Sequence, residues 1–186
     1  MSDEKNRNRL QQLDPDRTRG TTRQLFDDVR GKFGGVPNLF RVLGNSPAAL
    51  EGYLKFSAVL ATGTFDAGIR EQIALAVAAS NLCAYCLSAH TLLARGIGLT
   101  EQNIGDAGRA TAATDKTDAI LKLARSIVVQ RGEVSDSDLQ RAREAGLTDG
   151  EIVETVANVV LNIFTNYINH VARTIVDFPL VKPGAD

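Results

Sequence analysis

The sequence of 186 residues is poor in aromatic and sulfur-containing side chains: it has no tryptophan, one methionine and two cysteines, and aromatic residues make up 5% of it. It also lacks an excess of charge of either sign, because 21 basic residues face 22 acidic ones and leave a formal net charge of -1. A chain without a basic surplus has no electrostatic footprint for nucleic acid, and one without an acidic surplus has none for a basic partner. We therefore expect no nucleic-acid partner.

Two kinds of hydrophobic segment are also missing. Residues 1–19 mix both signs of charge and contain no apolar core of the kind that a signal peptide requires, so we expect a cytoplasmic protein. The stretch from Gln72 to Ala94 contains no Asp, Glu, Lys or Arg, but polar side chains are spread through it and would be costly in lipid. The sequence therefore predicts a buried helical hairpin at residues 67–98 instead of a membrane span.

The chain has no run of alternating polar and apolar residues long enough for a β-strand, which predicts an all-α fold of seven or eight helices. Capping residues and glycines place eight helices at about residues 21–33, 47–62, 67–81 and 83–97, then from 100, from 114 to 132, from 135 to 146 and from 148 to 173, with a short segment at about residues 39–43. We expect residues 1–19 to form a polar N-terminal arm, mobile or extended across a neighbouring surface, and residues 20–186 to form a single helical domain.

An internal duplication is a possible interpretation of two echoes in the sequence. Ala94-Arg95-x-x-Gly98-Leu99-Thr100 recurs as Ala142-Arg143-x-x-Gly146-Leu147-Thr148, and the separation from Glu71 to His90 recurs from Glu151 to His170. The first echo is equally explained by a common way of ending one helix and starting the next. The last expected helix is apolar through Val153, Val156, Val159, Val160, Ile163 and Phe164.

Both cysteines fall in Cys83-Ala84-Tyr85-Cys86, at the expected start of a helix, where the helix dipole lowers the pKa of a thiol. In a helix, Cys83, Cys86 and His90 lie on one face at spacings of three and four residues. The two thiols can then form a disulfide, and the imidazole can accept a proton from sulfur or pair with a thiolate. Glu71, on the preceding helix, would reach His90 if the two helices pack antiparallel.

Two other interpretations of these residues stay open. Cys83, Cys86 and His90 could bind zinc with Glu71 or His170 as a fourth ligand, although structural zinc sites usually pair two short ligand clusters and only one is present. A non-enzymatic helical oligomeric scaffold with inert cysteines is the other interpretation. His170 lies in the polar patch from Phe164 to His170, which favours a buried hydrogen-bond network over a role at the site.

The pattern Glu71-x11-Cys83-x2-Cys86-x3-His90 resembles the signature of the alkylhydroperoxidase AhpD-like group within the carboxymuconolactone decarboxylase family. Residues 35–38, 73–77, 87–90 and 164–170 resemble the peroxidase-related branch of that family, and the likeness covers roughly residues 20–180. The resemblance implies an all-helical homo-oligomer, a trimer or hexamer, with thiol peroxidase or disulfide reductase activity. It implies no bound cofactor and no metal.

The resemblance assigns Cys86 as the peroxidatic thiol, Cys83 as the resolving thiol, and His90 with Glu71 as the proton relay. The implied partners are a hydroperoxide substrate and an external dithiol reductant of the lipoyl or thioredoxin type. This sequence departs from the family pattern at Tyr85, where well-studied members have a histidine. A phenol titrates at about 10 and cannot serve as the same base at neutral pH, although its hydroxyl could donate a hydrogen bond.

Overall fold

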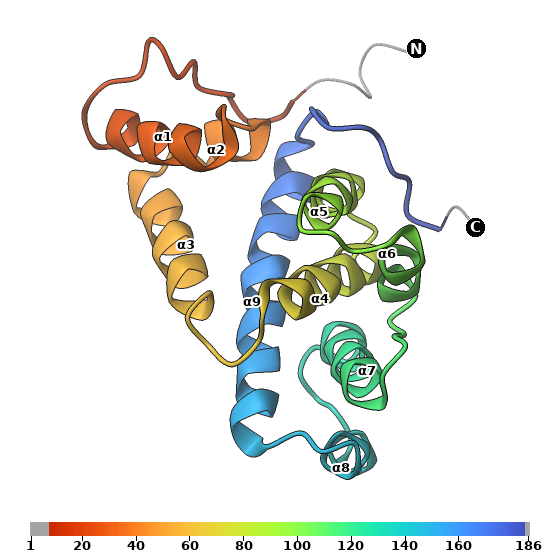
Figure 1. The fold of residues 1–186 in the computed structure, drawn as a ribbon. Coiled ribbons are helices and arrows are strands. Elements are labelled where there is room, and N and C mark those ends of the chain that lie inside the picture. The colour runs from red at the N-terminus through yellow and green to blue at the C-terminus, as the bar shows by residue number, and fades with distance from the viewer. Residues whose placement is uncertain (1–7, 185–186) are drawn as a thin grey trace.

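The computed structural model describes residues 8–184, and within that range the chain forms nine α-helices and no β-strand (Figure 1). The helices are α1 (Gly20–Phe33), α2 (Asn38–Leu43), α3 (Pro47–Leu60), α4 (Ala67–Ser80), α5 (Ala84–Gly96), α6 (Glu101–Gly108), α7 (Asp115–Val129), α8 (Asp136–Glu144) and α9 (Asp149–Ala172). The all-α class predicted from the sequence is confirmed, with one helix more than expected.

Most of the helices begin where a short polar side chain caps them. Asp66, Thr114 and Thr148 each accept a hydrogen bond from the backbone N–H three residues further along the chain. Each bond satisfies one of the amides that the first turn of a helix leaves unpaired. These caps place the starts of α4, α7 and α9 where the sequence predicts them.

Helix α4 lies at the centre of the molecule, with α5, α6, α7 and α9 packed around it (Figure 1). All of its residues from Ile73 to Ala78 are buried. A helix that is contacted from several sides has no solvent face, which explains why the sequence carries no charge here. In the part of the chain that the structure describes, no helix is long and apolar enough to cross a membrane.

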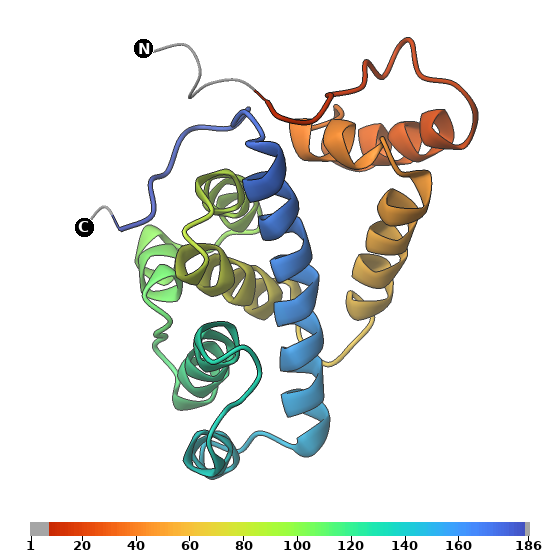
Figure 2. The same cartoon turned by 180° about the vertical axis from the view of Figure 1, so that it is seen from behind.

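Helix α9 runs along the molecule (Figure 2), and its buried side is largely polar. Its buried residues are Glu151, Thr155, Asn158, Val159, Asn162, Thr165, Asn166, Asn169 and Ala172. Several of these polar groups bond within the helix: the Asn158 amide donates to the carbonyl of Glu154, and the Asn162 amide to that of Asn158. Such bonds allow polar side chains to be buried without losing their partners. Most of the apolar residues noted in the sequence of this helix therefore face outward.

The two ends of the described chain lie across the helices. Residues 8–14 form no helix and bend at residues 9 and 10, and the N–H of Arg9 donates to the carbonyl of Ala172 at 2.7 Å, next to the end of α9. At the other end, the N–H of Val181 donates to the hydroxyl of Ser88 on α5 at 2.9 Å. The remainder of the expected N-terminal arm, residues 1–7, lies outside the described residues.

The first sequence echo marks two similar local structures. Gly98 and Gly146 both have a φ of 88°, the left-handed conformation that glycine adopts without strain at the end of a helix. Thr100 and Thr148 then start the next helices, each with a capping box. The shared motif therefore ends one helix and starts the next, as the alternative to duplication predicts.

The second echo is not reproduced in space, so it gives the duplication hypothesis no structural support. Glu71 and His90 lie on neighbouring helices and contact each other. Glu151 and His170 lie near opposite ends of the single helix α9, about 28 Å apart at the rise of an α-helix. Glu151 instead pairs with Lys116, at 2.7 Å.

Candidate active site

Cys83 and Cys86 are joined in a disulfide at the start of α5. Cys83 is the N-cap residue of this helix, and its Sγ accepts the N–H of Cys86 at 3.2 Å. Both side chains are buried, with 2% and 3% of their surface exposed. A thiolate at either position would lie close to the partial positive charge of the helix N-terminus, which favours the ionised form of the sulfur.

The α4–α5 hairpin brings two of the predicted residues into contact. Oε2 of Glu71 lies 2.8 Å from Nδ1 of His90, and both side chains are about four-fifths buried. The carboxylate favours the tautomer with the proton on Nδ1, which leaves Nε2 as the proton acceptor of the ring. His90 follows Cys86 by one helical turn, but among residues 8–184 no hydrogen bond joins its ring to either sulfur of the disulfide.

Tyr85, the residue that departs from the family pattern, is used to hold segments together. Its hydroxyl accepts the N–H of Leu39 at 3.0 Å, and its ring packs edge-on against Phe178 with ring centroids 5.5 Å apart. Burial and the nearby carboxylate of Asp177 raise the pKa of Tyr85 far above its usual range. The phenol therefore stays protonated and provides no base at neutral pH.

His170 contacts the turn that precedes the cysteines. Its Nε2 lies 2.9 Å from the backbone oxygen of Asn81, and the side-chain amide of Asn81 donates to Oδ1 of Asn166 at 3.1 Å. A hydrogen-bond network therefore connects α9 to the end of α4. Asn166 is buried in this network, whereas the ring of His170 is exposed and does not contact the sulfurs.

A residue that the sequence analysis did not single out contacts the disulfide directly. The Nδ2 of Asn169 on α9 donates to Sγ of Cys86 at 3.3 Å, across 83 positions of sequence. No local spacing reveals such a contact. The only signal in the sequence is the density of amide side chains between residues 164 and 170.

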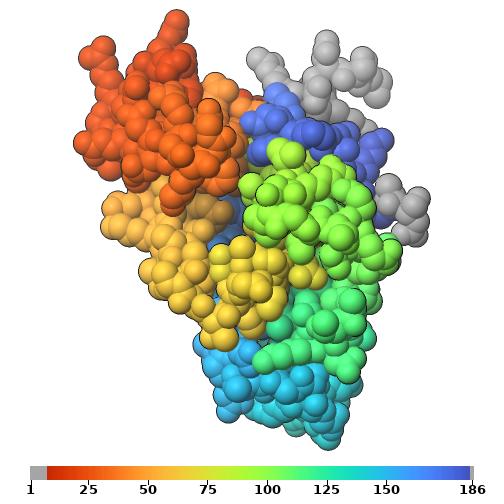
Figure 3. All heavy atoms as spheres, viewed as in Figure 1, coloured from red at the N-terminus to blue at the C-terminus, as the bar shows by residue number. Residues whose placement is uncertain are grey.

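Two adjoining cavities meet at His90. A cavity of about 200 Å³ lies among α3, α4, α5 and α9, with Glu71 in its wall. A smaller one of about 60 Å³ lies on the other side, and the walls of both include Phe33, Tyr53, His90 and Leu93. The molecular surface is hollowed between α3 and α5, where α9 is visible at the floor (Figure 3). The cavity lined by Glu71 and His90 lies among these same helices.

The few aromatic side chains of the chain gather around the smaller cavity. The chain has seven phenylalanines and three tyrosines, and five of these ten residues line the cavity: Phe33, Phe40, Tyr53, Tyr85 and Phe178. Burial and the charge of Glu71 raise the pKa of Tyr53 to about 12, so this phenol in the wall is uncharged. Apolar and aromatic walls with a few polar groups are typical of sites for organic ligands. The low aromatic content gave no indication of this arrangement.

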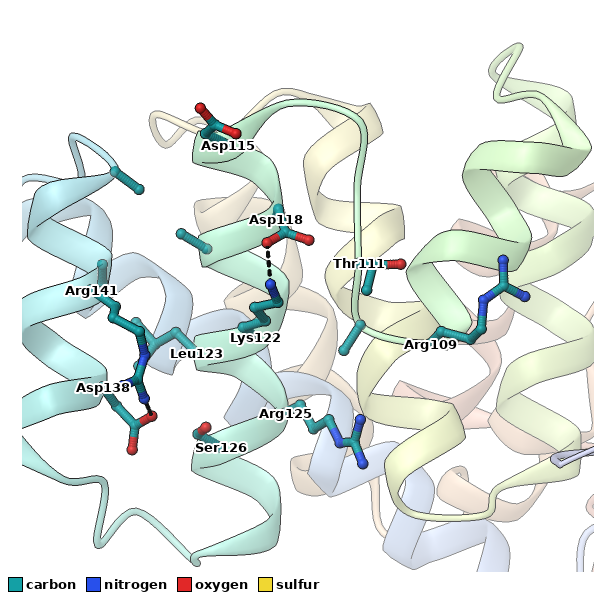
Figure 4. Close-up of a pocket in the computed structure, with 14 residues that line it drawn as sticks. Arg109, Thr111, Asp115, Asp118, Lys122, Leu123, Arg125, Ser126, Asp138 and Arg141 are labelled. Carbon is teal, nitrogen blue, oxygen red and sulfur yellow. Dashed lines mark hydrogen bonds and ion pairs between the residues drawn. The ribbon is translucent and has the colours of Figure 1, made fainter.

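A larger cavity, of about 450 Å³, lies away from the cysteines and is bounded by residues of α7 and α8 and the loop before α7 (Figure 4). Four of its charged side chains form two pairs: Lys122 lies 2.6 Å from Asp118, and Arg141 contacts Asp138. None of the predicted site residues lines it.

The zinc interpretation receives no support from the arrangement of the ligands. Within the described range, no three His, Cys, Asp or Glu side chains lie close enough together to hold a metal ion. The two sulfurs are bonded to each other, and Nδ1 of His90 is taken by Glu71. His170 is bound to a backbone oxygen elsewhere.

Fold and site together define an all-helical protein with a redox-active CxxC disulfide beside a Glu–His pair. Residues 47–127 match the carboxymuconolactone decarboxylase family. An alkyl hydroperoxide reductase of Mycobacterium tuberculosis is 31% identical over 110 residues, which span 58% of this chain and 32% of that protein. The chain thus matches about a third of that relative's length.

Solved structures agree with the fold. The alkylhydroperoxidase AhpD core of a peroxidase-related protein from Ralstonia eutropha JMP134 has a TM-score of 0.79 at 24% identity, over 90% of both chains. A variant of the debrominase Bmp8 in complex with 2,3,4-tribromopyrrole has a TM-score of 0.72 at 14% identity, over 83% of this chain and 84% of its own. The resemblance to the AhpD-like group of the carboxymuconolactone decarboxylase family is thereby confirmed.

Proposed function

We propose that this protein is a thiol peroxidase that reduces organic hydroperoxides through a dithiol–disulfide cycle of Cys83 and Cys86. The observation that carries the proposal is the placement of this disulfide in the first turn of α5, one turn from a His90 that is held by Glu71. The alkyl hydroperoxide reductase among its relatives supports the same class of activity.

In the proposed cycle, the Cys86 thiolate attacks one oxygen of the peroxide. An S–O bond forms, the O–O bond breaks, and the alcohol leaves after it receives a proton. The Cys83 thiolate then attacks the sulfur of Cys86, an S–S bond forms, and the oxygen leaves as water after protonation. The peroxide gains two electrons from the two thiols. An external dithiol of the lipoyl or thioredoxin type restores the pair, which requires a reducing compartment such as the cytoplasm.

His90 and Glu71 supply the proton transfers in this proposal. His90 Nε2 takes the thiol proton of Cys86 and returns it to the leaving oxygen, while Glu71 orients the ring and stabilises its charged form. Tyr85 takes no part as a base, because its phenol stays protonated. The relay in this chain therefore depends on a single histidine.

The substrate class follows from the walls of the cavities at His90. Aromatic side chains bound one side, and Ser57, Arg70 and Glu71 contribute polar groups on the other. In this proposal the alkyl or aryl group of a hydroperoxide packs against the aromatic side, with its peroxide end toward His90. We therefore expect an organic hydroperoxide to be a better substrate than hydrogen peroxide.

We also propose that the protein assembles with copies of itself. Along the outer face of α9, apolar side chains recur at spacings of three and four residues: Val153, Val156, Val160, Phe164, Tyr167 and Val171. A groove of about 330 Å³ between α3 and α9 adjoins this stripe. An exposed apolar patch of this extent is typical of an interface between subunits.

The activity is tested by following hydroperoxide consumption with dihydrolipoamide as the reductant. Cumene hydroperoxide, which carries an aryl group, is compared with hydrogen peroxide. Cys86→Ser is expected to abolish consumption, because it removes the attacking sulfur. Cys83→Ser is expected to react once and stop, because no disulfide can form.

The two serine variants control for each other, since each changes one sulfur of the same helical turn. Undiminished turnover by Cys86→Ser would overturn the proposed mechanism. One zinc ion bound per chain of the reduced protein would instead favour the metal interpretation. A hydrogen peroxide rate equal to the cumene hydroperoxide rate would contradict the proposed substrate class.

A further inference from the structure

Asn169 is the side chain of α9 that reaches the reactive sulfur. Its Nδ2 donates to Sγ of Cys86 at 3.3 Å, and only 5% of the residue is exposed. Its Oδ1 is fully buried and has no hydrogen-bond partner among the described residues. Buried amide oxygens are usually paired, so an unpaired one beside a reactive group calls for a chemical explanation.

We propose that Asn169 is a further catalytic residue, whose amide N–H holds Cys86 as a thiolate and whose free carbonyl oxygen receives the sulfenic acid that forms there. This inference rests on the proposed function. It adds to the cycle a group that directly contacts the reacting sulfur from another helix.

The first part of the argument concerns the choice between the two thiols. Cys83, as the N-cap residue, receives the backbone N–H of Cys86 and the dipole of α5. The helix start alone would therefore make Cys83 the more acidic thiol. The Asn169 amide gives Cys86 a donor of its own, and a thiolate, which only accepts hydrogen bonds, gains more from that donor than a thiol does. Asn169 thus directs the attack on peroxide to Cys86.

The second part concerns the free oxygen of the same amide. When the Cys86 thiolate attacks the peroxide, the S–O bond forms, the O–O bond breaks and the alcohol leaves, so that Cys86 becomes a sulfenic acid. Its O–H is a donor that neither the thiolate nor the disulfide has, and Oδ1 of Asn169 is the unpaired acceptor beside it. When Cys83 displaces this oxygen as water, the donor disappears and Oδ1 is unpaired again, as in the disulfide form described here.

The test measures each thiol separately in the reduced full-length protein. Alkylation by iodoacetamide is followed over pH, and mass spectrometry of the peptides distinguishes Cys83 from Cys86. In Asn169→Leu, the pKa of Cys86 is expected to rise by about one while that of Cys83 stays the same, because one charge-assisted hydrogen bond is lost. Asn169→Asp, which keeps the shape but replaces the donor by a negative charge, is expected to raise it further.

Thr165→Val is the matched control, since Thr165 is equally buried one turn earlier on α9 and bonds only to the carbonyl of Asn162. Asn169→Ala, which only removes atoms, replaces the leucine variant if that variant does not fold. In the same proteins, cumene hydroperoxide should react about tenfold more slowly with Asn169→Leu at neutral pH and recover at alkaline pH, where the thiolate forms without help.

The outcomes separate this inference from the proposed function. A Cys86 pKa that is the same in the wild type and in both Asn169 variants overturns the inference, whether or not the protein consumes hydroperoxide. A raised Cys86 pKa in these variants supports the thiolate contact. If the wild type shows no hydroperoxide consumption in spite of that shift, it is the proposed function that fails. The lifetime of the Cys86 sulfenic acid is measured in the Cys83→Ser protein, with Asn169 present and with Asn169 replaced. Equal lifetimes overturn the second part of the argument, in which Oδ1 of Asn169 accepts the O–H of the sulfenic acid.

Discussion

At the scale of single residues, the site contains two kinds of contact. One kind was predicted from the spacing of residues in the sequence, and the other arises only when the chain folds. The Glu71–His90 contact at 2.8 Å follows from a helical hairpin of the predicted length. Asn169 reaches Cys86 from a helix that starts more than sixty residues further along the chain. Tyr85 occupies the position of a family histidine, yet its hydroxyl holds the backbone of Leu39. Residue identity at a motif position therefore does not by itself assign a role.

Glu71→Gln tests the relay at this scale. The amide can still bond to His90, but it no longer stabilises the charged imidazole, so we expect kcat/KM for hydroperoxide to fall about ten- to a hundredfold. The fall should be present throughout the range from pH 5 to 9, because the pair no longer supplies the proton transfers. Stopped-flow measurement of thiol oxidation between pH 5 and 9 checks both effects.

Glu101→Gln is the control for this variant, because Glu101 also pairs with a basic side chain, Arg95, at 2.6 Å but lies on the exposed start of α6. It should leave the rate and the pH profile unchanged. A Glu71→Gln protein with the wild-type profile would remove Glu71 from the relay.

At the scale of elements, the sequence predicts where helices start and end better than which side they bury. Caps and glycines act within a few residues, so the starts of α4, α7 and α9 were predictable. Which side of α9 is buried was not predictable, because both sides are dense in uncharged residues. Valines lie on one side, and asparagines and threonines lie on the other. Intrahelical hydrogen bonds let the second side be buried, and this depends on the neighbours that surround it.

Helix α9 contacts the loop between α3 and α4 through a carboxylate, so the contribution of this contact to stability should depend on pH. The carboxylate of Glu154 accepts the N–H groups of Thr64 and Phe65, each at 2.9 Å. Partial burial raises the pKa of Glu154, but the bonds to Phe65 and Thr64 and the charge of Arg70 together outweigh it, and the net pKa is lowered. A lowered pKa in the folded state means that the stabilisation is present above the unfolded pKa and is lost as pH falls through the folded one.

Glu154→Gln should therefore lower the free energy of unfolding by about 1 kcal/mol at pH 7, since one charge-assisted acceptor is replaced by a neutral one near solvent. The difference from the wild type should shrink as pH is lowered toward 3, where Glu154 itself becomes neutral. Urea unfolding at both pH values measures it. Glu133→Gln, at an exposed loop position, serves as the control. A difference that grows on acidification would contradict the assigned role of these bonds.

At the scale of the whole molecule, the inward polar side of α9 and its outward apolar side are two consequences of one arrangement. The amides that reach the disulfide and the turn before it occupy the buried side. The valines and aromatic residues are therefore left on the surface, along a stripe about 27 Å long from Val153 to Val171. Such a stripe would be a liability in a monomer, and contact with another copy of the chain would cover it.

Val160→Glu tests this assembly, because Val160 lies in the middle of the stripe and also lines the groove between α3 and α9. A charge there would have to be buried without a partner in the interface. We therefore expect the dissociation constant of the oligomer to rise at least about tenfold. Light scattering coupled to size-exclusion chromatography measures the mass over a range of concentrations. Val129→Glu is the matched control, since Val129 is equally apolar and exposed but lies at the end of α7, away from the stripe. A wild-type protein that is monomeric at every concentration, or an oligomer that survives Val160→Glu unchanged, would show that this face is not the interface.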